Sequence, residues 1–191
     1  MSRSAIVVTG ATGFVGSRLV AHLLGEGREV ITPLRDSGRA PEGATGVEWD
    51  LCAGGLADQV LDRTAAIAHA AAFIPPDHSD PAHAEQCLRA NVLGSLRLVE
   101  EAIDAGVPAI VQLNAGNLYR DLYALAGEDD PLHIPAHAPY YLASKLVQET
   151  FTETVTRTAA LRLVNLRPSA IYGPGMRPTG LIPAFTERLL A

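Results

Sequence analysis

Tyr141 and Lys145 stand four residues apart in the stretch APYYLASK at residues 138–145. Positions i and i+4 lie on one face of a helix, so the two side chains would be within reach of each other. A lysine ammonium beside a phenol stabilises the phenolate, and the pKa of Tyr141 should therefore be lowered toward neutrality. Such a pair suits oxidation of an alcohol or reduction of a ketone if a nicotinamide ring is close. The same spacing also occurs on solvated helix faces, which is the alternative.

A glycine-rich turn near the N-terminus would supply the site for that nicotinamide cofactor. The segment TGATGFVGSRLV follows an apolar run and leads into an amphipathic helix. Glycine in such a turn lets the backbone approach a pyrophosphate, and the first N–H groups of the helix attract its charge. This context favours dinucleotide binding over simple helix–strand packing. The residues expected to contact the cofactor here are Gly10, Thr12, Gly13, Phe14, Val15 and Gly16.

The end of the second expected strand should lie beside the adenosine ribose. The first polar side chain there is Arg35, followed by Asp36. An arginine would pair with the extra phosphate of NADP, whereas an acidic residue would hold the ribose hydroxyls of NAD. Arg35 favours NADP modestly, with Arg39 as possible support. NAD, held through Asp36, is the alternative, and so is a solvated Arg35.

The elements that must position these residues follow from the pattern of apolar runs. Short apolar runs alternate with segments of helical period, which predicts βαβ units and a parallel sheet. We expect strands at 5–9, 29–34, 66–71, 109–113 and 162–167, and helices at 14–25, 56–63, 83–105 and 140–158. The predicted fold class is α/β, a Rossmann-type doubly wound parallel sheet in three α/β/α layers.

Composition and charge exclude several classes of protein. The chain has 191 residues, 48% hydrophobic and 19% charged, which predicts one domain with a buried core. A net charge of −6 with scattered cations argues against nucleic-acid binding. No apolar run approaches the ~20 residues of a membrane span and no signal peptide is recognisable, so we expect a cytoplasmic protein without a membrane partner.

The cysteines and histidines give no pattern of a metal site. Cys52 and Cys87 lack disulfide-framework or metal-type spacing. Pro135 separates His133 from His137 and disfavours a helix that would align the two rings. No metal is expected, and loop histidines such as His78 are expected to be solvated.

Several further motifs occur in order along the chain. They are TGATGFVG at 9–16, WDL at 49–51, HAAA at 69–72, NVLGS at 91–95, PYYLASKLVQE around the tyrosine–lysine pair, and LRPSAIYGPG at 166–175. Together they resemble the extended short-chain dehydrogenase/reductase family, of the nucleotide-sugar epimerase and dehydratase type. The resemblance implies an NAD(P)-dependent enzyme acting on a hydroxyl or keto group of a sugar nucleotide or similar small metabolite.

The resemblance also implies roles for individual residues. Tyr141 would be the catalytic acid and base, and Lys145 would lower its pKa and hold the nicotinamide ribose. Asp50 would contact the adenine end of the cofactor, and Asn91 would support the site. The remaining residues expected to line the cofactor cleft are Leu51, His69, Ala70, Ala71, Ala72 and Pro168. Members often form homodimers through the YxxxK helix and the long helix before it, so a homodimer is a possible state.

Two departures from the family pattern favour an alternative function. Members usually carry a serine or threonine hydroxyl four residues before the tyrosine of the fourth-strand motif, where this chain has Ala115. Asn114 or Asn117 could donate an amide N–H instead. Members also continue well beyond the YGPG segment, so we expect residues 1–191 to be an NAD(P)-binding domain whose substrate lobe is truncated after about residue 175. The alternative is a dinucleotide-binding module with weak or no catalysis.

Overall fold

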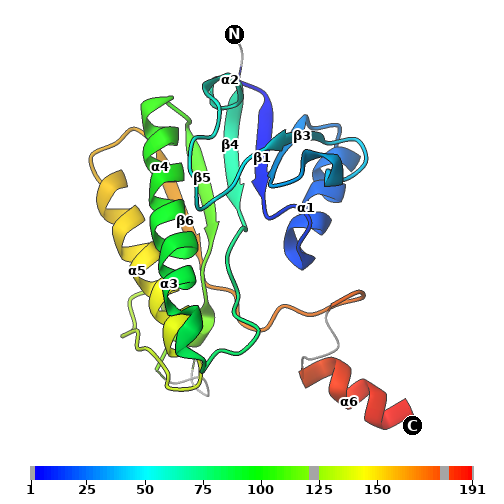
Figure 1. The fold of residues 1–191 in the computed structure, drawn as a ribbon, viewed down its shortest axis with the longest axis vertical. Coiled ribbons are helices and arrows are strands. Elements are labelled where there is room, and N and C mark those ends of the chain that lie inside the picture. Colours follow the sequence, from blue (N-terminus) through cyan, green and yellow to red (C-terminus); the bar gives the residue numbers. More distant parts are fainter. Residues whose placement is uncertain (1–2, 121–124, 177–180, 191) are drawn as a thin grey trace.

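The computed structural model describes residues 3–120, 125–176 and 181–190 and contains a six-stranded parallel sheet (Figure 1). The strands are β1 (Ala5–Thr9), β2 (Val30–Leu34), β3 (Thr45–Glu48), β4 (Thr64–His69), β5 (Ala109–Leu113) and β6 (Arg162–Leu166). Their order across the sheet is β3-β2-β1-β4-β5-β6, and every neighbouring pair is parallel. This is the strand order of a doubly wound dinucleotide-binding fold, so the predicted fold class is confirmed.

Helices cover both faces of the sheet. The α-helices of the described residues are α1 (Phe14–Gly25), α2 (Asp58–Leu61), α3 (Ala84–Gln86), α4 (Ser95–Asp104), α5 (Pro139–Thr156) and α6 (Leu181–Leu190). Helix α6 lies away from the sheet (Figure 1). Figure 1 shows α4 and α5 side by side and α1 at the other side of the sheet. The chain leaves β1 in one direction to reach β2 and in the other to reach β5 and β6, so right-handed crossovers place these helices on opposite faces.

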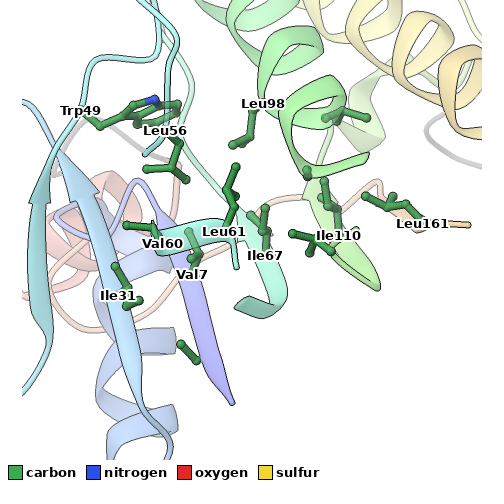
Figure 2. Packing of buried hydrophobic residues seen from close by; sticks show 14 residues of the cluster. Val7, Ile31, Trp49, Leu56, Val60, Leu61, Ile67, Leu98, Ile110 and Leu161 are labelled. Atoms are coloured by element: carbon green, nitrogen blue, oxygen red, sulfur yellow. The ribbon is translucent and has the colours of Figure 1, made fainter. Parts of the chain in front are cut away.

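Alternation along the strands builds two separate cores. Val7 and Ile67 point into a large cluster with Leu98 of α4, which Figure 2 shows together with Trp49 and Leu56. Val8, the next residue of β1, points to the other face and packs with Val20 of α1. Successive residues of a strand face opposite sides of the sheet, and here both sides are buried.

The structure differs from the predicted elements in four places, three of which are short segments. The edge strand β3 was not predicted, because its sequence TGVE has no apolar run; it is held by backbone pairing with β2, from Thr45 opposite Ile31 to Glu48 opposite Leu34. Strand β4 ends at His69 instead of residue 71, because the N–H of Ala71 donates to the Thr9 hydroxyl. Helix α2 is also shorter than predicted.

The predicted long helix over 83–105 is divided. A 3₁₀ turn at Pro81–His83 and the short α3 lead into a π-helical segment, Cys87–Gly94, and only then into α4. Gly94 packs against Leu51, because a Cβ on Gly94 would lie 2.7 Å from Leu51 Cγ and closer still to its carbonyl oxygen. The wider π-helical turn carries Asn91 toward the site described below.

Gly94→Ala should therefore destabilise the fold by about 1–3 kcal/mol, because the Leu51 backbone must shift to admit a methyl group. Urea denaturation at one pH measures the free energy of unfolding. Gly25→Ala is the matched control: a Cβ on this residue of α1 meets nothing within 4 Å, so the change should be neutral or slightly stabilising. Equal losses in both variants would contradict the packing argument.

Candidate active site

The glycine turn between β1 and α1 is packed so tightly that side chains are excluded. Gly10 has a φ of +69°, and a Cβ there would lie 2.7 Å from the backbone nitrogen of Ala71. A Cβ on Gly16 would lie 2.7 Å from the carbonyl carbon of Gly10. The turn and the segment after β4 are thereby brought together, as the motif requires.

The start of α1 is suited to a phosphate group. Gly13 is the N-cap and supplies no side chain to the free N–H groups of the first turn. Thr12 is exposed beside it, and Phe14 and Val15 begin the helix. These residues therefore fit the pyrophosphate of a dinucleotide, with unpaired donors and an approach free of Cβ atoms.

The predicted adenosine end is a surface cleft of about 290 Å³ lined by Arg35, Glu48, Trp49 and Asp50. Arg35 is exposed at the end of β2. The carboxylate of Asp36 accepts the N–H of Gly38 at 3.0 Å, and that of Asp50 accepts the N–H of Cys52 at 2.8 Å. Trp49 is 7% exposed and packs in the core with Leu56 (Figure 2).

Asn91 joins the loop after β4 to α5. Its side-chain oxygen accepts the N–H of Phe73 at 2.7 Å, and its amide nitrogen donates to the Phe73 carbonyl at 3.0 Å and to Ser144 Oγ at 2.9 Å. Ser144 Oγ in turn donates to the Tyr141 carbonyl at 2.7 Å. The asparagine is fully buried, so this part of the loop is held against the turn of α5 that bears Tyr141.

Lys145 is not on a solvated face. It is 2% exposed and donates to the Leu113 carbonyl at 2.7 Å, at the carboxyl end of β5, and to Gln148 Oε1 at 2.5 Å. Burial lowers the pKa of Lys145 to about 7, and the nearby Glu149 carboxylate opposes this shift. The lysine can therefore hold or release a proton near neutral pH.

The predicted lowering of the Tyr141 pKa is not found in this arrangement. Burial raises the pKa of Tyr141 above its usual value, and the neighbouring Cys87 thiol adds to the rise. The described hydrogen bonds of Lys145 go to Leu113 and Gln148, so desolvation of the phenol prevails. The i, i+4 spacing places both residues on α5 but does not direct the ammonium at the phenol.

His78 lies beside the candidate catalytic tyrosine, where the sequence predicted a solvated loop residue. Its ring meets that of Tyr141 edge-on, with the ring centroids 5.6 Å apart. Its Nδ1 atom is buried and has no hydrogen-bond partner among the described residues. Loops that follow the strands of a doubly wound sheet border the ligand crevice, and this rule is the signal that could have found His78.

Ala115 makes the other side of Tyr141 apolar. It is buried in a cluster with Leu118, Ala138 and Leu142, against which Tyr141 packs. The Asn114 amide, considered as a substitute donor, donates to the Glu149 carboxylate instead, and Asn117 is exposed. No described side chain from this strand end therefore replaces the missing hydroxyl.

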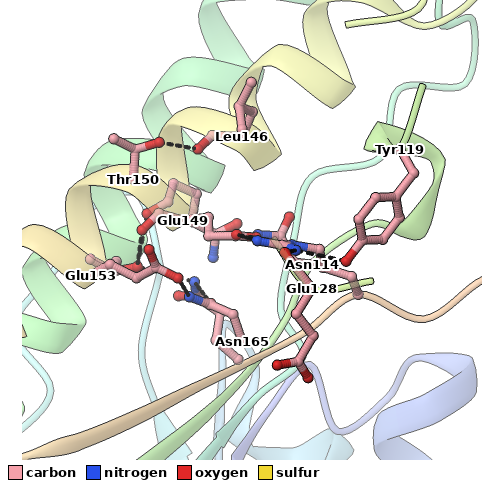
Figure 3. Close-up of polar contacts among 12 residues, drawn as sticks. Asn114, Tyr119, Glu128, Leu146, Glu149, Thr150, Glu153 and Asn165 are labelled. Atoms are coloured by element: carbon pink, nitrogen blue, oxygen red, sulfur yellow. Dashed lines mark hydrogen bonds and ion pairs between the residues drawn. The ribbon is translucent and has the colours of Figure 1, made fainter. Parts of the chain in front are cut away.

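A partly buried ion pair, which no sequence pattern indicated, joins α5 to the segment after β6. Glu149, 3% exposed, accepts two hydrogen bonds from Arg167 Nε, at 2.9 and 3.2 Å. Arg167 Nη1 donates to the Tyr119 hydroxyl at 2.7 Å. Figure 3 shows Glu149 pointing toward Asn114, with Tyr119 beyond it. The pair holds the chain that leads into Pro168.

Pro168 and the residues after it pass along the carboxyl edge of the sheet. The Pro168 carbonyl accepts the N–H of Gly116 at 2.9 Å. Further on, a Cβ on Gly173 would lie 3.7 Å from the Phe14 ring, so this segment reaches the start of α1. The predicted residues thus form one continuous edge from the glycine turn to α5, with the Arg35 and Asp50 cleft at its far end.

Two classes of site are not seen among the described residues. Residues 3–120, 125–176 and 181–190 contain no group of three metal-ligating side chains. None of the helices in these ranges combines the length and apolar character needed to cross a bilayer.

The fold and the glycine turn define a Rossmann-type dinucleotide-binding protein. The model of the NAD dependent epimerase/dehydratase family matches residues 6–191. The chain belongs to this family, which confirms the resemblance found in the sequence.

Individual relatives agree with this assignment. The chain is 31% identical to a dTDP-glucose 4,6-dehydratase of Streptomyces antibioticus and 33% identical to a UDP-glucose 4-epimerase of Mycolicibacterium smegmatis, over 97% of its own length in each case. It spans 58% and 63% of these two relatives.

Solved structures are similar over a comparable range. MoeE5 in complex with UDP-glucose and NAD has a TM-score of 0.81 and 31% identity, covering 94% of this chain and 59% of MoeE5. The NDP-hexosamine 5,6-dehydratase TunA, described as NAD dependent, has a TM-score of 0.78 and 28% identity, covering 98% of this chain and 62% of TunA.

Buried His69 should make the fold sensitive to acid. Burial, and secondly the charge of Lys145, lower the pKa of His69 from 6.5 to about 3. Between these values the unfolded chain binds one more proton than the folded chain, so stability should fall as the pH is lowered through this window, by up to about 1.4 kcal/mol per pH unit. The measurement is urea denaturation from pH 7 to pH 3 of the wild type and His69→Asn.

The free energy of unfolding should change less steeply with pH in His69→Asn, because the substitution removes the titrating imidazole. The exposed residue His22 on α1 provides the control, and His22→Asn should keep the wild-type slope. An unchanged slope in His69→Asn would show that other groups cause the acid sensitivity.

Proposed function

We propose that residues 1–191 form the NAD(P)-binding domain of an enzyme that acts on a hydroxyl or keto group of a sugar nucleotide or a similar small metabolite. The observation that carries the proposal is the meeting of two sites at one edge of the sheet. Gly10 follows the carboxyl end of β1, and Lys145 donates to the carboxyl end of β5. The names of the relatives, a dehydratase and an epimerase of sugar nucleotides, support the substrate class.

In this proposal the residues of the chain bind, orient and move protons. The glycine turn and the first N–H groups of α1 hold the pyrophosphate, and Asp50 and Leu51 lie at the adenine end. The segment 70–72 and Pro168 line the cleft, and the buried side chains of His69 and Asn91 support it from within the protein. A bound nicotinamide would supply the exchange of hydride.

Tyr141 is assigned the transfer of a proton to or from the substrate oxygen. Its phenol is half-buried between His78 and the apolar cluster around Ala115. In the proposed mechanism the Lys145 ammonium, whose pKa burial lowers to about 7, turns toward the phenolate or a ribose hydroxyl when these are present. The lowered tyrosine pKa then belongs to the cofactor-bound state.

The second candidate is a dinucleotide-binding module with weak or no catalysis. It is favoured by Ala115, which removes a hydroxyl donor, and by the engagement of Asn114 with Glu149. Loss of one donor to a developing oxyanion costs about 10²–10³-fold in rate. A homodimer through α4 and α5 is compatible with either function, and the half-exposed Phe151 on α5 would then be covered.

The enzymatic proposal predicts that Tyr141→Phe abolishes turnover. Purified protein is incubated with NAD or NADP and a panel of sugar nucleotides, and products and reduced cofactor are followed. The rate should fall about 10²–10⁴-fold in Tyr141→Phe, because the acid and base is removed, while cofactor affinity is retained. Tyr140→Phe, one residue away and off the lysine face, should keep the wild-type rate. Tight cofactor binding by the wild type with no turnover across the panel would favour the module.

The choice between NADP and NAD is assigned to Arg35. It lines the cleft, whereas the carboxylate of Asp36 caps Gly38, and this supports NADP; the NAD found with MoeE5 supports the alternative. Arg35→Ala should weaken NADP binding about 10–100-fold and NAD binding little, because a charge-assisted bond to the extra phosphate is lost. Calorimetric Kd values measure this, with Arg28→Ala, at the opposite end of β2, as the control. Equal effects on both cofactors would contradict the NADP assignment.

A further inference from the structure

Lys145 is the only lysine in the 191-residue sequence, although the sequence contains 14 arginines. Its ammonium is buried, and the described hydrogen bonds that it donates go to the Leu113 carbonyl and to Gln148 Oε1. A buried charge is costly unless it is hydrogen-bonded, so these two acceptors govern how readily the charged form exists. The backbone carbonyl is fixed by the sheet, and Gln148 is the acceptor that a substitution can change.

Gln148 also connects the lysine to a continuous buried chain of hydrogen bonds. Its amide nitrogen lies 3.0 Å from Ser95 Oγ, which lies 2.8 Å from His69 Nε2. His69 Nδ1 lies 2.7 Å from Thr9 Oγ1. All four side chains are at most 1% exposed. Thr9 immediately precedes Gly10, so the chain runs from the candidate catalytic lysine to the glycine turn.

The direction of the two hydrogen bonds of Gln148 follows from the Lys145 ammonium. An ammonium can only donate, so the glutamine must turn its oxygen to Lys145 and its NH₂ group to Ser95. Ser95 Oγ then accepts from Gln148 and can donate its own hydrogen to His69 Nε2. In the arrangement in which Ser95 donates to His69 Nε2, the His69 proton is on Nδ1 and is donated to Thr9 Oγ1. Thr9 Oγ1 also accepts the N–H of Ala71 at 3.1 Å.

We propose that Gln148 is a positioning residue that holds the Lys145 ammonium and, through Ser95, sets the tautomer of His69. The assignment of Lys145 to the chemistry rests on the proposed function. The hydrogen-bond chain itself does not, because it is formed within the protein alone. This series of hydrogen bonds gives Lys145 one defined position relative to the glycine turn before a cofactor binds.

The charged and titratable groups around Lys145 come from four elements. Helix α5 contributes Tyr141 and Glu149, β4 contributes His69, and the π-helical segment contributes Cys87. Arg167, which follows β6, pairs with Glu149. Substitution of Gln148 by an apolar residue removes none of these groups. A change in the titration of Lys145 would then report the lost hydrogen bond.

The test is the titration of Lys145 by NMR of protein labelled with ¹³C at lysine Cε, which gives one side-chain signal because there is one lysine. The wild-type midpoint should be near 7. In Gln148→Leu it should fall by about one pH unit or more, because a hydrogen bond to the charged form is lost. In Gln148→Glu it should rise, because the new acceptor is a carboxylate.

Gln112→Leu is the matched control. Gln112 is also fully buried, on β5, but its amide donates to Thr152 and Asn165 and not to the lysine network. Its substitution should leave the Lys145 midpoint at the wild-type value. A midpoint in Gln148→Leu equal to that in Gln112→Leu would overturn the proposal. Should Gln148→Leu fail to fold, the absence of an upward shift in Gln148→Glu would overturn it equally.

A second measurement tests the His69 end of the hydrogen-bond series. Long-range ¹H–¹⁵N spectra should show wild-type His69 as the Nδ1–H tautomer, with its signals assigned by comparison with His69→Asn. A proton on Nε2 would show that Ser95 accepts from His69, and it would overturn the proposed tautomer. Both experiments use the cofactor-free chain, so their outcome is independent of turnover, and an inactive protein with the expected titration would reject the proposed function alone.

Discussion

The close approach of Gly10 to the backbone of Ala70 and Ala71 is the contact from which the rest of the site follows. It requires a positive φ and no side chain, because a Cβ would lie 2.7 Å from the Ala71 nitrogen. This close approach, together with the pairing of Thr9 opposite His69, lets the Thr9 hydroxyl accept the Ala71 N–H and contact the His69 ring. The glycine turn therefore organises the buried polar groups of β4 as well as offering space for a phosphate.

A second constraint acts at the other end of the site. The buried Glu149 carboxylate pairs with the partly exposed Arg167, and Asn114 and Tyr119 also bond to this pair. Removing one member of a buried pair leaves an uncompensated charge, so the arrangement tolerates little change. The Asn114 amide donates to Glu149 and is therefore not available to a substrate. The pair also holds the segment after β6 beside Gly116. Ala115 is therefore packed within a cluster of apolar side chains beside this ion pair.

Local sequence patterns predicted the elements that have strong local signals. The apolar run before Gly10 and the amphipathic helix after it were placed correctly, and so were the ends of β5. Strand β3 was missed because TGVE has no apolar pattern and is held by pairing with β2. Gln148 contacts Ser95 across 53 residues, and no spacing rule detects such a pair. The predicted lowering of the Tyr141 pKa by Lys145 was wrong. The i, i+4 spacing shows which groups can come into contact, but it does not show which acceptor the ammonium donates to.

The single lysine of the sequence is buried, and this limits which covalent modifications of lysine can occur within these residues. Arginine supplies the other side-chain cations of the printed sequence, and the single ε-amino group is 2% exposed. Enzymes that acetylate or ubiquitinate lysine would find no accessible acceptor within these 191 residues. Modification of Lys145 would require the site itself to open, and it would disrupt the arrangement on which the proposed chemistry depends.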